Sequence, residues 1–274
     1  MGTAADYGYL RRLVLGHSHN VLAPSQDYLF EAHLSRLLRD LGMSRVEELV
    51  RHLRARRDPA LERAIAEAMT INETSFFRDQ RPFELLRKEL LPALIERRRE
   101  KRSLRFWSAA CSTGQEALSL AMLLLESFPE LATWAIRIDG TDICGEAVAR
   151  ASAARYHRIE VNRGLPARYL VKYFEQDGEE WIAGPEIRGL CNFRQVNLCT
   201  GPLPFGEKFD LVFLRNVMLY FSQETRRSLL SEIHRHTASD GVLVLGVSEQ
   251  ADSTLWTSVL AGGTSYYRPV RQRS

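Results

Sequence analysis

Several features that define common protein classes are missing from this chain of 274 residues. Its cysteines, Cys111, Cys144, Cys191 and Cys199, contain no CxxC pair, which argues against a zinc site or other metal centre and against a disulfide scaffold. No run of about 18 apolar residues is present, so we expect no membrane insertion. Residues 1–15 lack an apolar core of signal-peptide length, and we therefore expect a cytoplasmic protein.

Positive and negative charges are nearly balanced, because the chain has 37 lysines and arginines and 34 acidic residues. The net charge of +3 does not by itself indicate nucleic-acid binding. The distribution is less even. Arginines are concentrated between residues 36 and 57, and a second basic run covers residues 97–102. A solvated helix face is the ordinary explanation of such runs. The alternative is a docking surface for an acidic partner, formed by Arg36, Arg39, Arg45, Arg51 and Arg54.

The first part of the chain has the apolar spacing of helices and no strand pattern. Leucine and phenylalanine recur at helical intervals over residues 28–41, where Gly42 ends the segment, and Asp58-Pro59 begins another helix. We predict a small all-α N-terminal domain over residues 1–78. A long helix, interrupted at Pro92, is predicted as a linker over residues 79–102.

From Leu104 onward, short apolar strands alternate with helices, which predicts an α/β fold with a doubly wound parallel sheet over residues 103–274. Residues 156–196 break this alternation. Strand candidates near Trp181 and over residues 190–196 predict a small antiparallel β insert there. The predicted strands of the main sheet cover residues 104–110, 135–141, 209–214 and 242–247, and residues 266–270 are predicted as an antiparallel edge strand.

A loop of small residues, 108–114, joins the first strand to its helix. Ligands of open α/β sheets bind at the carboxyl ends of strands, where small residues let the backbone approach. Only Gly114 is a glycine, so neither the dinucleotide fingerprint nor the phosphate-loop pattern is present. The loop alone is a weak signal, and a purely structural turn is an equal alternative.

Two aspartates, Asp139 and Asp142, compete for a ligand role at the end of the second strand. An acid there can hold ribose hydroxyls. We favour Asp142, and a turn at Asp139-Gly140 is the plain alternative for the other aspartate. Arg215 and Asn216 directly follow the apolar strand over residues 209–214. Packing alone explains this pair poorly, because burial of a charge is costly. A ligand role for this pair is one interpretation, and a structural ion pair with helix capping is the alternative.

Taken together, these segments resemble the chemotaxis receptor methyltransferase (CheR) family. The resemblance covers nearly the whole chain and rests on NETSFFR (residues 72–78), WSAACSTGQE (107–116), GTDI (140–143), QVNL (195–198) and RNVMLYF (215–221), in the order of the family. It implies a Rossmann-like class I methyltransferase sheet that uses S-adenosylmethionine to esterify glutamate side chains of methyl-accepting chemotaxis receptors.

The same resemblance implies roles for individual residues. Asp142 would hold the ribose, Glu116 would lie near the amino-acid end, and Asn197 and Leu198 would frame the adenine. Arg78 and Tyr220 would flank the transferred methyl group as catalytic residues. The complete implied cofactor set is Asn72, Thr74, Arg78, Glu116, Asp142, Asn197, Leu198, Arg215 and Asn216.

The sequence also departs from the family. Gln115-Glu116-Ala117-Leu118 stands where members often have Glu-Glu-Pro-Tyr, although Glu116 is kept. The insert between Phe174 and Trp181 is short, whereas members that bind a receptor tether peptide have a longer loop. We therefore expect an enzyme that needs no tether. A monomer is the simplest expectation for its oligomeric state. Two other functions stay open: a methyltransferase of RNA or a small molecule, and a non-catalytic cofactor sensor.

Overall fold

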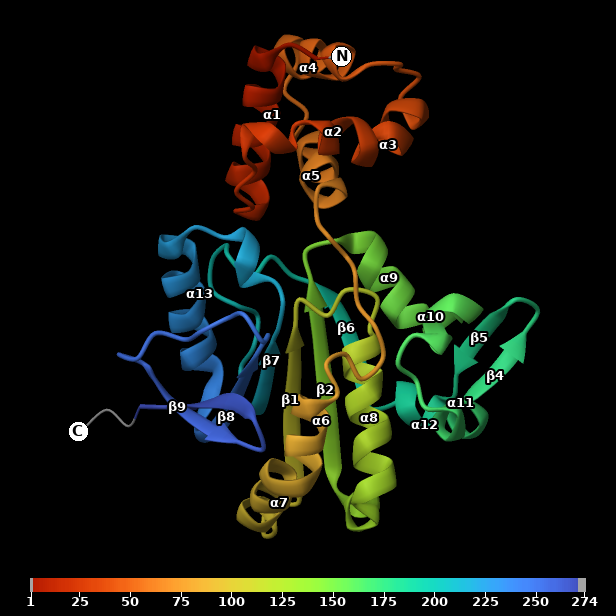
Figure 1. Ribbon diagram of the computed structural model, residues 1–274, viewed down its shortest axis with the longest axis vertical. Coiled ribbons are helices and arrows are strands. Elements are labelled where there is room, and N and C mark those ends of the chain that lie inside the picture. The colour runs from red at the N-terminus through yellow and green to blue at the C-terminus, as the bar shows by residue number, and fades with distance from the viewer. Residues whose placement is uncertain (1, 271–274) are drawn as a thin grey trace. The chain divides into compact units, whose positions relative to one another are not determined.

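The computed structural model describes residues 2–270 (Figure 1). Met1 and residues 271–274, the outermost positions of the two predicted domains, lie outside the described residues. The chain divides into two compact units. One runs to Ile71 and includes Tyr220–Arg226; the other contains Asn72–Leu219 and the chain from Arg227 onward. This division corrects the predicted boundary at residue 78, because the NETSFFR segment belongs to the second unit.

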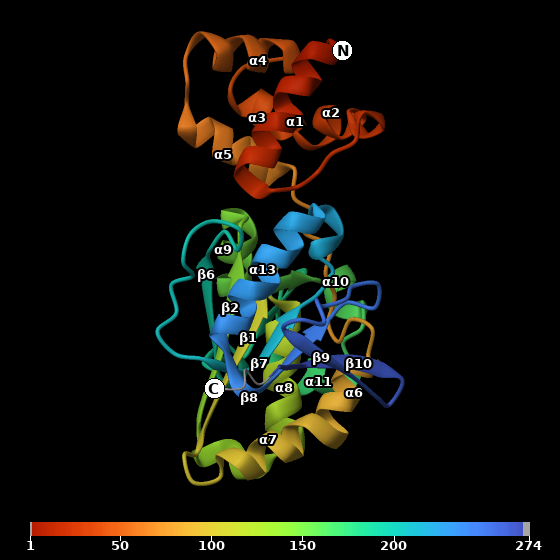
Figure 2. The same cartoon turned by 90° about the vertical axis from the view of Figure 1, so that its left-hand side faces the viewer.

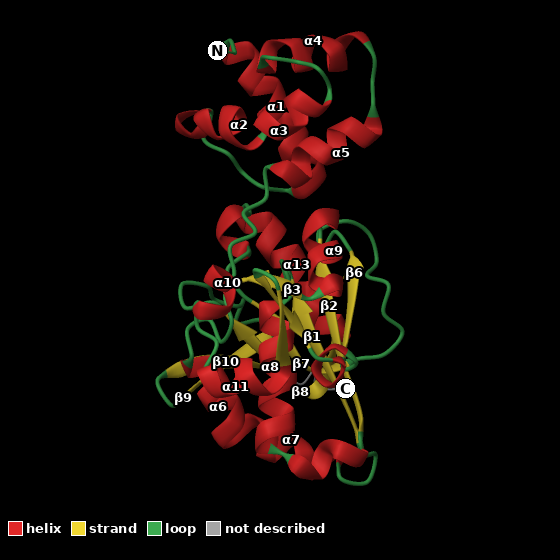
Figure 3. Cartoon of the chain, turned by 90° about the vertical axis from the view of Figure 1, so that its right-hand side faces the viewer, coloured by secondary structure: helices red, strands yellow, loops and turns green. Residues whose placement is uncertain are grey.

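Every regular element of residues 2–71 is a helix (Figure 3). Thr3 caps the first helix in a capping box with Asp6, and Asp58 caps the last by accepting hydrogen bonds from two backbone amides. The predicted helix over residues 28–41 is divided at Leu34, and Gly42 ends it with φ +67°. The elements are α1 (Ala4–Ser18), η1 (Pro24–Gln26), α2 (Tyr28–His33), α3 (Ser35–Asp40), α4 (Val46–Ala55) and α5 (Pro59–Ala68).

The second unit is built on a seven-stranded sheet of order β6-β2-β1-β7-β8-β10-β9. The first five strands in this order are parallel, and β10 is antiparallel to both of its neighbours. The doubly wound sheet is therefore confirmed, with helices on both faces (Figure 2). The strands are β1 (Ser103–Ala109), β2 (Ala135–Asp142), β6 (Cys191–Gln195), β7 (Phe209–Leu214), β8 (Thr237–Leu245), β9 (Trp256–Ala261) and β10 (Thr264–Pro269).

The helices of this unit pack apolar side chains against the sheet. The predicted linker helix consists of α6, a π-helical segment η2 and α7, and Pro92 is the second residue of α7. At the amino ends of the strands, Arg98 donates hydrogen bonds to Asp210 and Asp240 and so fastens α7 to β7 and β8. The elements are α6 (Arg81–Leu85), η2 (Leu86–Leu90), α7 (Leu91–Arg98), α8 (Gln115–Ser127), η3 (Pro129–Thr133), α9 (Gly145–Ala153), η4 (Met218–Tyr220) and α13 (Gln223–His236).

A three-stranded antiparallel sheet of order β3-β5-β4 forms the core of the insert, which we define as β3 through α12. The predicted extent, 156–196, is wrong at its end: residues 191–195 form β6, parallel to β2 in the main sheet. Because β6 is an edge strand of mixed polarity, its sequence resembles that of a hairpin strand. The insert contains β3 (Arg155–His157), α10 (Arg158–Asn162), α11 (Ala167–Tyr173), β4 (Phe174–Asp177), β5 (Glu180–Ala183) and α12 (Pro185–Arg188).

The predicted antiparallel strand near the C-terminal end exists as β10, but it is not the edge of the sheet. It lies between β8 and β9, and the sequence analysis did not predict β9. Among residues 2–270, no helix has both the length and the apolar character that a membrane crossing requires.

Candidate cofactor and catalytic site

The loop between β1 and α8 is held close to the sheet by its own unusual backbone. Ala110, Ser112 and Gly114 all have positive φ, at 61°, 50° and 93°. A Cβ atom on Gly114 would lie 2.9 Å from the Cβ of Ala151 and 3.1 Å from the ring of Phe193. Only glycine therefore fits at this point, and the loop is compact where a ligand can meet backbone atoms.

Asp142 holds this loop from the end of β2. Its carboxylate accepts hydrogen bonds from the backbone amides of Ser112 at 2.8 Å and Cys144 at 3.0 Å, and the residue is 6% exposed. The hydroxyl of Ser112 in turn donates to the carbonyl of Asn72 at 2.7 Å. Three predicted segments, around residues 72, 112 and 142, are thus joined directly in one site.

Asp139 has a different environment. It is fully buried inside β2, and the guanidinium groups of Arg105, Arg137 and Arg194 lie 3.4, 3.0 and 3.5 Å from its carboxylate. Asn192 donates a further hydrogen bond to it at 2.9 Å. A turn at Asp139 is therefore the wrong interpretation, because Asp139 is the centre of an ion-pair network within the strand.

Glu116 and Arg215 meet in the interior at the start of α8. Arg215 Nη1 donates to Glu116 Oε2 at 2.9 Å, and the hydroxyl of Ser108 donates to Glu116 Oε1 at 2.7 Å. The other terminal nitrogen of Arg215 donates to Asp79 at 2.7 Å and to the carbonyl of Arg78 at 2.9 Å. Arg215 thereby links the loop after β7, the helix α8 and the NETSFFR segment. The structural ion pair, which was the alternative interpretation of Arg215 in the sequence, is present.

The NETSFFR segment is positioned mainly by aromatic packing. The ring centroid of Phe76 lies 5.1 Å from that of Tyr156 and 5.6 Å from that of Phe174, both in the insert. The amide of Phe77 donates to Ser119 Oγ on α8 at 2.9 Å. Arg78 lies at the end of the segment that these contacts fix. Its guanidinium donates a hydrogen bond to the carbonyl of Glu73 at 2.9 Å.

The insert also packs against this segment and against the loop between β1 and α8. Gly164 packs so closely on the segment that an added Cβ would lie 2.1 Å from the carbonyl oxygen of Phe76. Tyr156 donates from its hydroxyl to the carbonyl of Thr113 at 2.8 Å, and burial raises the pKa of this hydroxyl. Thr74 is partly buried between the two ends of the segment.

Asn197 and Leu198 follow β6, and their predicted place at the end of an inserted hairpin is corrected accordingly. The amide of Val196 donates to the carbonyl of Asp142 at 2.8 Å, which brings this segment beside the second strand. Asn197 Oδ1 accepts a hydrogen bond from the amide of Cys199 at 3.0 Å, and Leu198 is 8% exposed.

Asn216 adopts φ 59°, in the left-handed region, directly after β7. Its Oδ1 atom is buried, and no hydrogen-bond partner for it exists within residues 2–270. The sequence analysis missed the residue that supports this loop: Glu249, 6% exposed, which accepts hydrogen bonds from the amides of Asn216, Val217 and Met218. No motif marks Glu249, since it acts on backbone atoms far from it in sequence.

Tyr220 ends η4 and groups with the helical unit rather than with Arg78. Its carbonyl accepts a hydrogen bond from the amide of Val21 at 2.9 Å. Ser222 caps α13, because its hydroxyl accepts a hydrogen bond from the amide of Thr225 at 3.1 Å.

The arginines proposed for docking are all exposed, but they divide between two helices of the helical unit. Arg36 and Arg39 lie on α3, whereas Arg45 precedes α4 and the other two lie on it. Arg54 is engaged within the unit: it lies 3.7 Å from Asp6 and over the ring of Tyr9.

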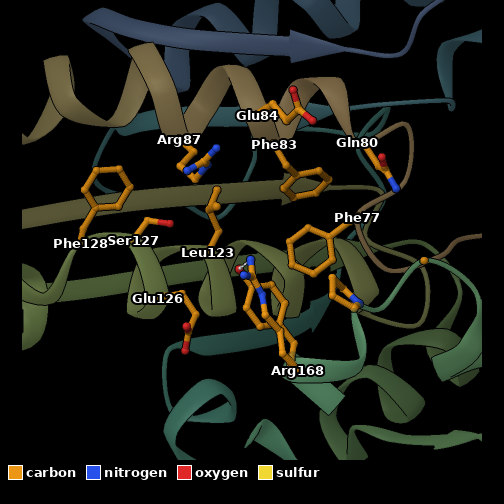
Figure 4. A pocket seen from close by; sticks show the side chains of 13 residues that line it. Phe77, Gln80, Phe83, Glu84, Arg87, Leu123, Glu126, Ser127, Phe128 and Arg168 are labelled. Carbon is orange, nitrogen blue, oxygen red and sulfur yellow. Dashed lines mark hydrogen bonds between the residues drawn. The ribbon is translucent and has the colours of Figure 1, made fainter. Parts of the chain in front are cut away.

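A separate cavity of about 760 Å³ opens between the linker helix, α8 and α11 (Figure 4). Arg87 and Glu84 reach it from the linker helix, and Arg168 reaches it from α11. Glu126, on its α8 side, accepts hydrogen bonds from Lys172 and Tyr173, which lower the pKa of its carboxyl group. None of the residues predicted to bind cofactor lines this cavity.

The site at the carboxyl ends of β1, β2 and β7 has a geometry that fits a nucleoside cofactor. An acid ends the second strand, a close-packed glycine loop ends the first, and an unpartnered buried amide oxygen lies after the neighbouring strand. This arrangement, on a doubly wound sheet, defines a nucleoside-binding α/β protein.

Comparison with known sequences identifies the family. Residues 72–264 match the family described as CheR methyltransferase, SAM binding domain. The chain is 39% identical over 250 residues to chemotaxis protein methyltransferase 1 of Pseudomonas aeruginosa, covering 89% of this chain and 90% of that protein. It is 36% identical over 234 residues to a chemotaxis protein methyltransferase of Pseudomonas putida, covering 84% of each. The chain belongs to the CheR methyltransferase family, and it is an S-adenosylmethionine-dependent methyltransferase.

Proposed function

We propose that this protein transfers a methyl group from S-adenosylmethionine to glutamate carboxylates on the cytoplasmic helical region of methyl-accepting chemotaxis receptors, and that it does so as a cytoplasmic monomer. The observation that carries the proposal is the direct connection between the NETSFFR segment and the loop between β1 and α8, through Ser112 and Asn72. Membership of a family whose relatives are chemotaxis protein methyltransferases supports the substrate class.

The proposed cofactor contacts follow the site as described above. Asp142 holds the ribose hydroxyls and Asn197-Leu198 frames the adenine. Glu116, with Arg215, lies at the amino-acid end, and the free Oδ1 of Asn216 supplies an acceptor. The backbone and side chains of Asn72, Thr74 and Arg78 complete the contact set.

The bound cofactor supplies a methyl group that its sulfonium has already activated, so a glutamate carboxylate can attack it without losing a proton. The protein therefore needs no general base, and its contribution is to orient the reactants, which can lower a barrier by roughly 7–11 kcal/mol. Charge is neutralised in the transition state. A side chain that bound the carboxylate too tightly would stabilise the ground state and slow the step.

This argument gives separate roles to Arg78 and Tyr220. Arg78 orients the substrate carboxylate without a tight buried ion pair, and its position at the end of the segment fixed by Phe76 and Phe77 supports that role. Tyr220 contributes one directed hydrogen bond or shapes the path of the methyl group. Arg78→Ala should reduce turnover much more than cofactor affinity; an equal fall in both would contradict this division.

The exposed arginines of the helical unit are proposed to guide the enzyme to its acidic substrate. Receptor methylation sites lie on helices rich in glutamate, and complementary charge accelerates encounter. Receptor methylation should slow markedly as ionic strength rises, because salt screens exposed charges. Arg36→Glu with Arg39→Glu should reproduce that loss at low salt, whereas a rate independent of ionic strength would remove the docking role.

Independence from a tether peptide is proposed from the insert. The hairpin between β4 and β5 turns at Gly178 and Glu179 only, which leaves little loop to bind a peptide. Receptors with and without their C-terminal peptides should be methylated at the same rate. A large loss of rate on removal of that peptide would contradict the proposal.

The decisive test is transfer of radiolabelled methyl from S-adenosylmethionine to membranes that contain the receptors, followed by alkaline treatment. Label on the receptor that base removes identifies a carboxyl methyl ester. Cofactor binding without receptor label would instead favour RNA, a small molecule or a sensor role.

A further inference from the structure

One carboxylate holds the loop that follows β7. Glu249 Oε2 accepts hydrogen bonds from the amides of Asn216 at 2.7 Å and Gly246 at 2.8 Å. Its Oε1 accepts from the amides of Val217 at 3.0 Å and Met218 at 2.8 Å. A single buried side chain therefore binds four backbone amides and joins the carboxyl ends of two adjacent parallel strands, β7 and β8.

The environment of Glu249 shows that these amides are what stabilises its charge. The residue is 6% exposed, and no arginine, lysine or histidine within residues 2–270 forms an ion pair with it. A buried carboxylate is costly unless hydrogen bonds compensate it, and amide donors to a charged acceptor are among the stronger ones. Successive amides that converge on one anion require an unusual backbone, and Asn216 supplies it with φ 59°.

Gly246 leaves the space that this arrangement needs. A Cβ atom at that position would lie 2.6 Å from Glu249 Oε2 and 3.0 Å from the amide nitrogen of Asn216. The end of β8 is therefore shaped to admit the carboxylate. Substitution at this glycine can disturb the loop after β7 without altering Glu249 itself.

We propose that Glu249 is a positioning residue for the cofactor: by binding the amides of residues 216–218 it fixes the loop that presents Arg215 and Asn216 to S-adenosylmethionine. This inference rests on the proposed cofactor contacts of those two residues. The side chain of Arg215, which is 2% exposed, binds both Glu116 and Asp79, so a shift of the loop backbone would move it away from these partners. The hydrogen bonds of Glu249 go to backbone amides, so it acts on Arg215 and Asn216 through the backbone.

Glu249→Gln provides a direct test because it keeps the size of the side chain. The new NH₂ group cannot accept hydrogen bonds, so two of the four amides lose their partner whichever way the side chain turns. If Glu249 positions the loop, the Kd for S-adenosylhomocysteine should rise by about tenfold or more, since two lost hydrogen bonds correspond to a change of that order. The number of binding sites per chain should stay the same.

A purely structural role gives a different result. Irreversibly misfolded chains would lower the number of binding sites with an unchanged Kd, and reversible unfolding would raise the apparent Kd only by the inverse of the folded fraction, which circular dichroism measures independently. The titration uses the full chain and needs no receptor, so it is informative even if the receptor is not the substrate. Failure of methyl transfer to receptors would count against the proposed function and leave this measurement intact.

Two further variants complete the design. Gly246→Ala should raise the same Kd, because it disturbs the carboxylate from β8. Asp252→Asn is the matched control: Asp252 lies on the same segment, and its carboxylate accepts hydrogen bonds from Thr254 and lies 3.9 Å from the guanidinium of Arg227. The proposal is overturned if Glu249→Gln and Gly246→Ala bind S-adenosylhomocysteine with the Kd of the unmodified chain, or if Asp252→Asn weakens binding equally.

Discussion

Arg215 and Glu116 form an ion pair 2.9 Å long, with side chains 2% and 11% exposed, between two elements separated by 99 positions in the chain. Breaking such a pair leaves one charge buried without compensation, which typically costs about 3–5 kcal/mol. The pair is therefore important to folding as well as to the proposed site.

The first prediction concerns this pair. Arg215→Ala should lower the free energy of unfolding by about 3–5 kcal/mol, since Glu116 then lacks its partner, and should abolish detectable cofactor binding. Denaturant unfolding and calorimetry measure the two effects. The control is Arg235→Ala: the side chain of Arg235 is 68% exposed where it pairs with Glu232, and it should contribute less than about 1 kcal/mol. Equal losses in the two variants would contradict the prediction.

A second prediction separates the two aspartates of β2. Asp139→Asn should lower stability by about 3 kcal/mol or more, because three arginines lose their common partner, while cofactor affinity stays unchanged in the folded protein. Asp142→Asn should weaken S-adenosylhomocysteine binding by about tenfold or more. Thermal unfolding and calorimetry on both variants provide the comparison. The assignment of the ribose to Asp142 fails if Asp139→Asn produces the larger change in affinity.

The third prediction uses two glycines with similar backbones. Gly164 has φ 91° and Gly178 has φ 62°, so alanine strains both by about 1 kcal/mol. Only at Gly164 would the added Cβ meet a backbone atom, 2.1 Å from the carbonyl of Phe76. Gly164→Ala should therefore displace the segment that ends at Arg78 and lower kcat, whereas Gly178→Ala should leave kcat unchanged. Similar kcat values would show that the segment tolerates displacement.

A fourth prediction concerns acid stability. Arg98 donates two hydrogen bonds to Asp240, at 2.8 and 2.6 Å, and they lower the pKa of that carboxyl group below its ordinary value of 3.8. Because the pKa of Asp240 is lower in the folded state than in the unfolded state, its carboxylate stabilises the fold fully at pH values above the unfolded-state pKa. This stabilisation is lost as the pH falls through the folded-state pKa.

Asp240→Asn should therefore lower the melting temperature by a few degrees at about pH 7, and the difference from the unmodified chain should shrink at about pH 3. Circular dichroism at both pH values measures it, with the exposed Glu130→Gln as control. A difference that persists undiminished in acid would show that the charge of Asp240 is not responsible.

The repeating patterns of this sequence predicted much of the fold because they report burial directly. Helix α8 and strand β7 lie where periodicity and apolar runs put them, since both are buried on most sides. Strand β6 was misassigned to the insert, because an edge strand alternates polar and apolar residues as a hairpin does. Strand β9 was missed for a similar reason, since half of its residues are exposed.

The site was predictable where a side chain carries the chemistry and less so where the backbone does. Asp142 was proposed because an acid at a strand end is recognisable and because of the family resemblance, and Glu116 was proposed from that resemblance; the structure places both beside the loop between β1 and α8. Glu249 was not proposed, because three of its four partner amides are 31 to 33 positions away in the chain. The three-arginine environment of Asp139 was equally invisible, since it depends on the register of β1, β2 and β6.

The packing of Phe76 against Tyr156 and Phe174 has a consequence for protein engineering. The insert is not an independent folding unit, because Phe76 contributes an aromatic side chain to its core. Phe76 precedes the first residues of the insert by about 80 positions in the chain. A chimera that exchanges only the insert between family members would leave Phe76 facing an unmatched core. Productive exchanges should carry the segment around Phe76 along with the insert.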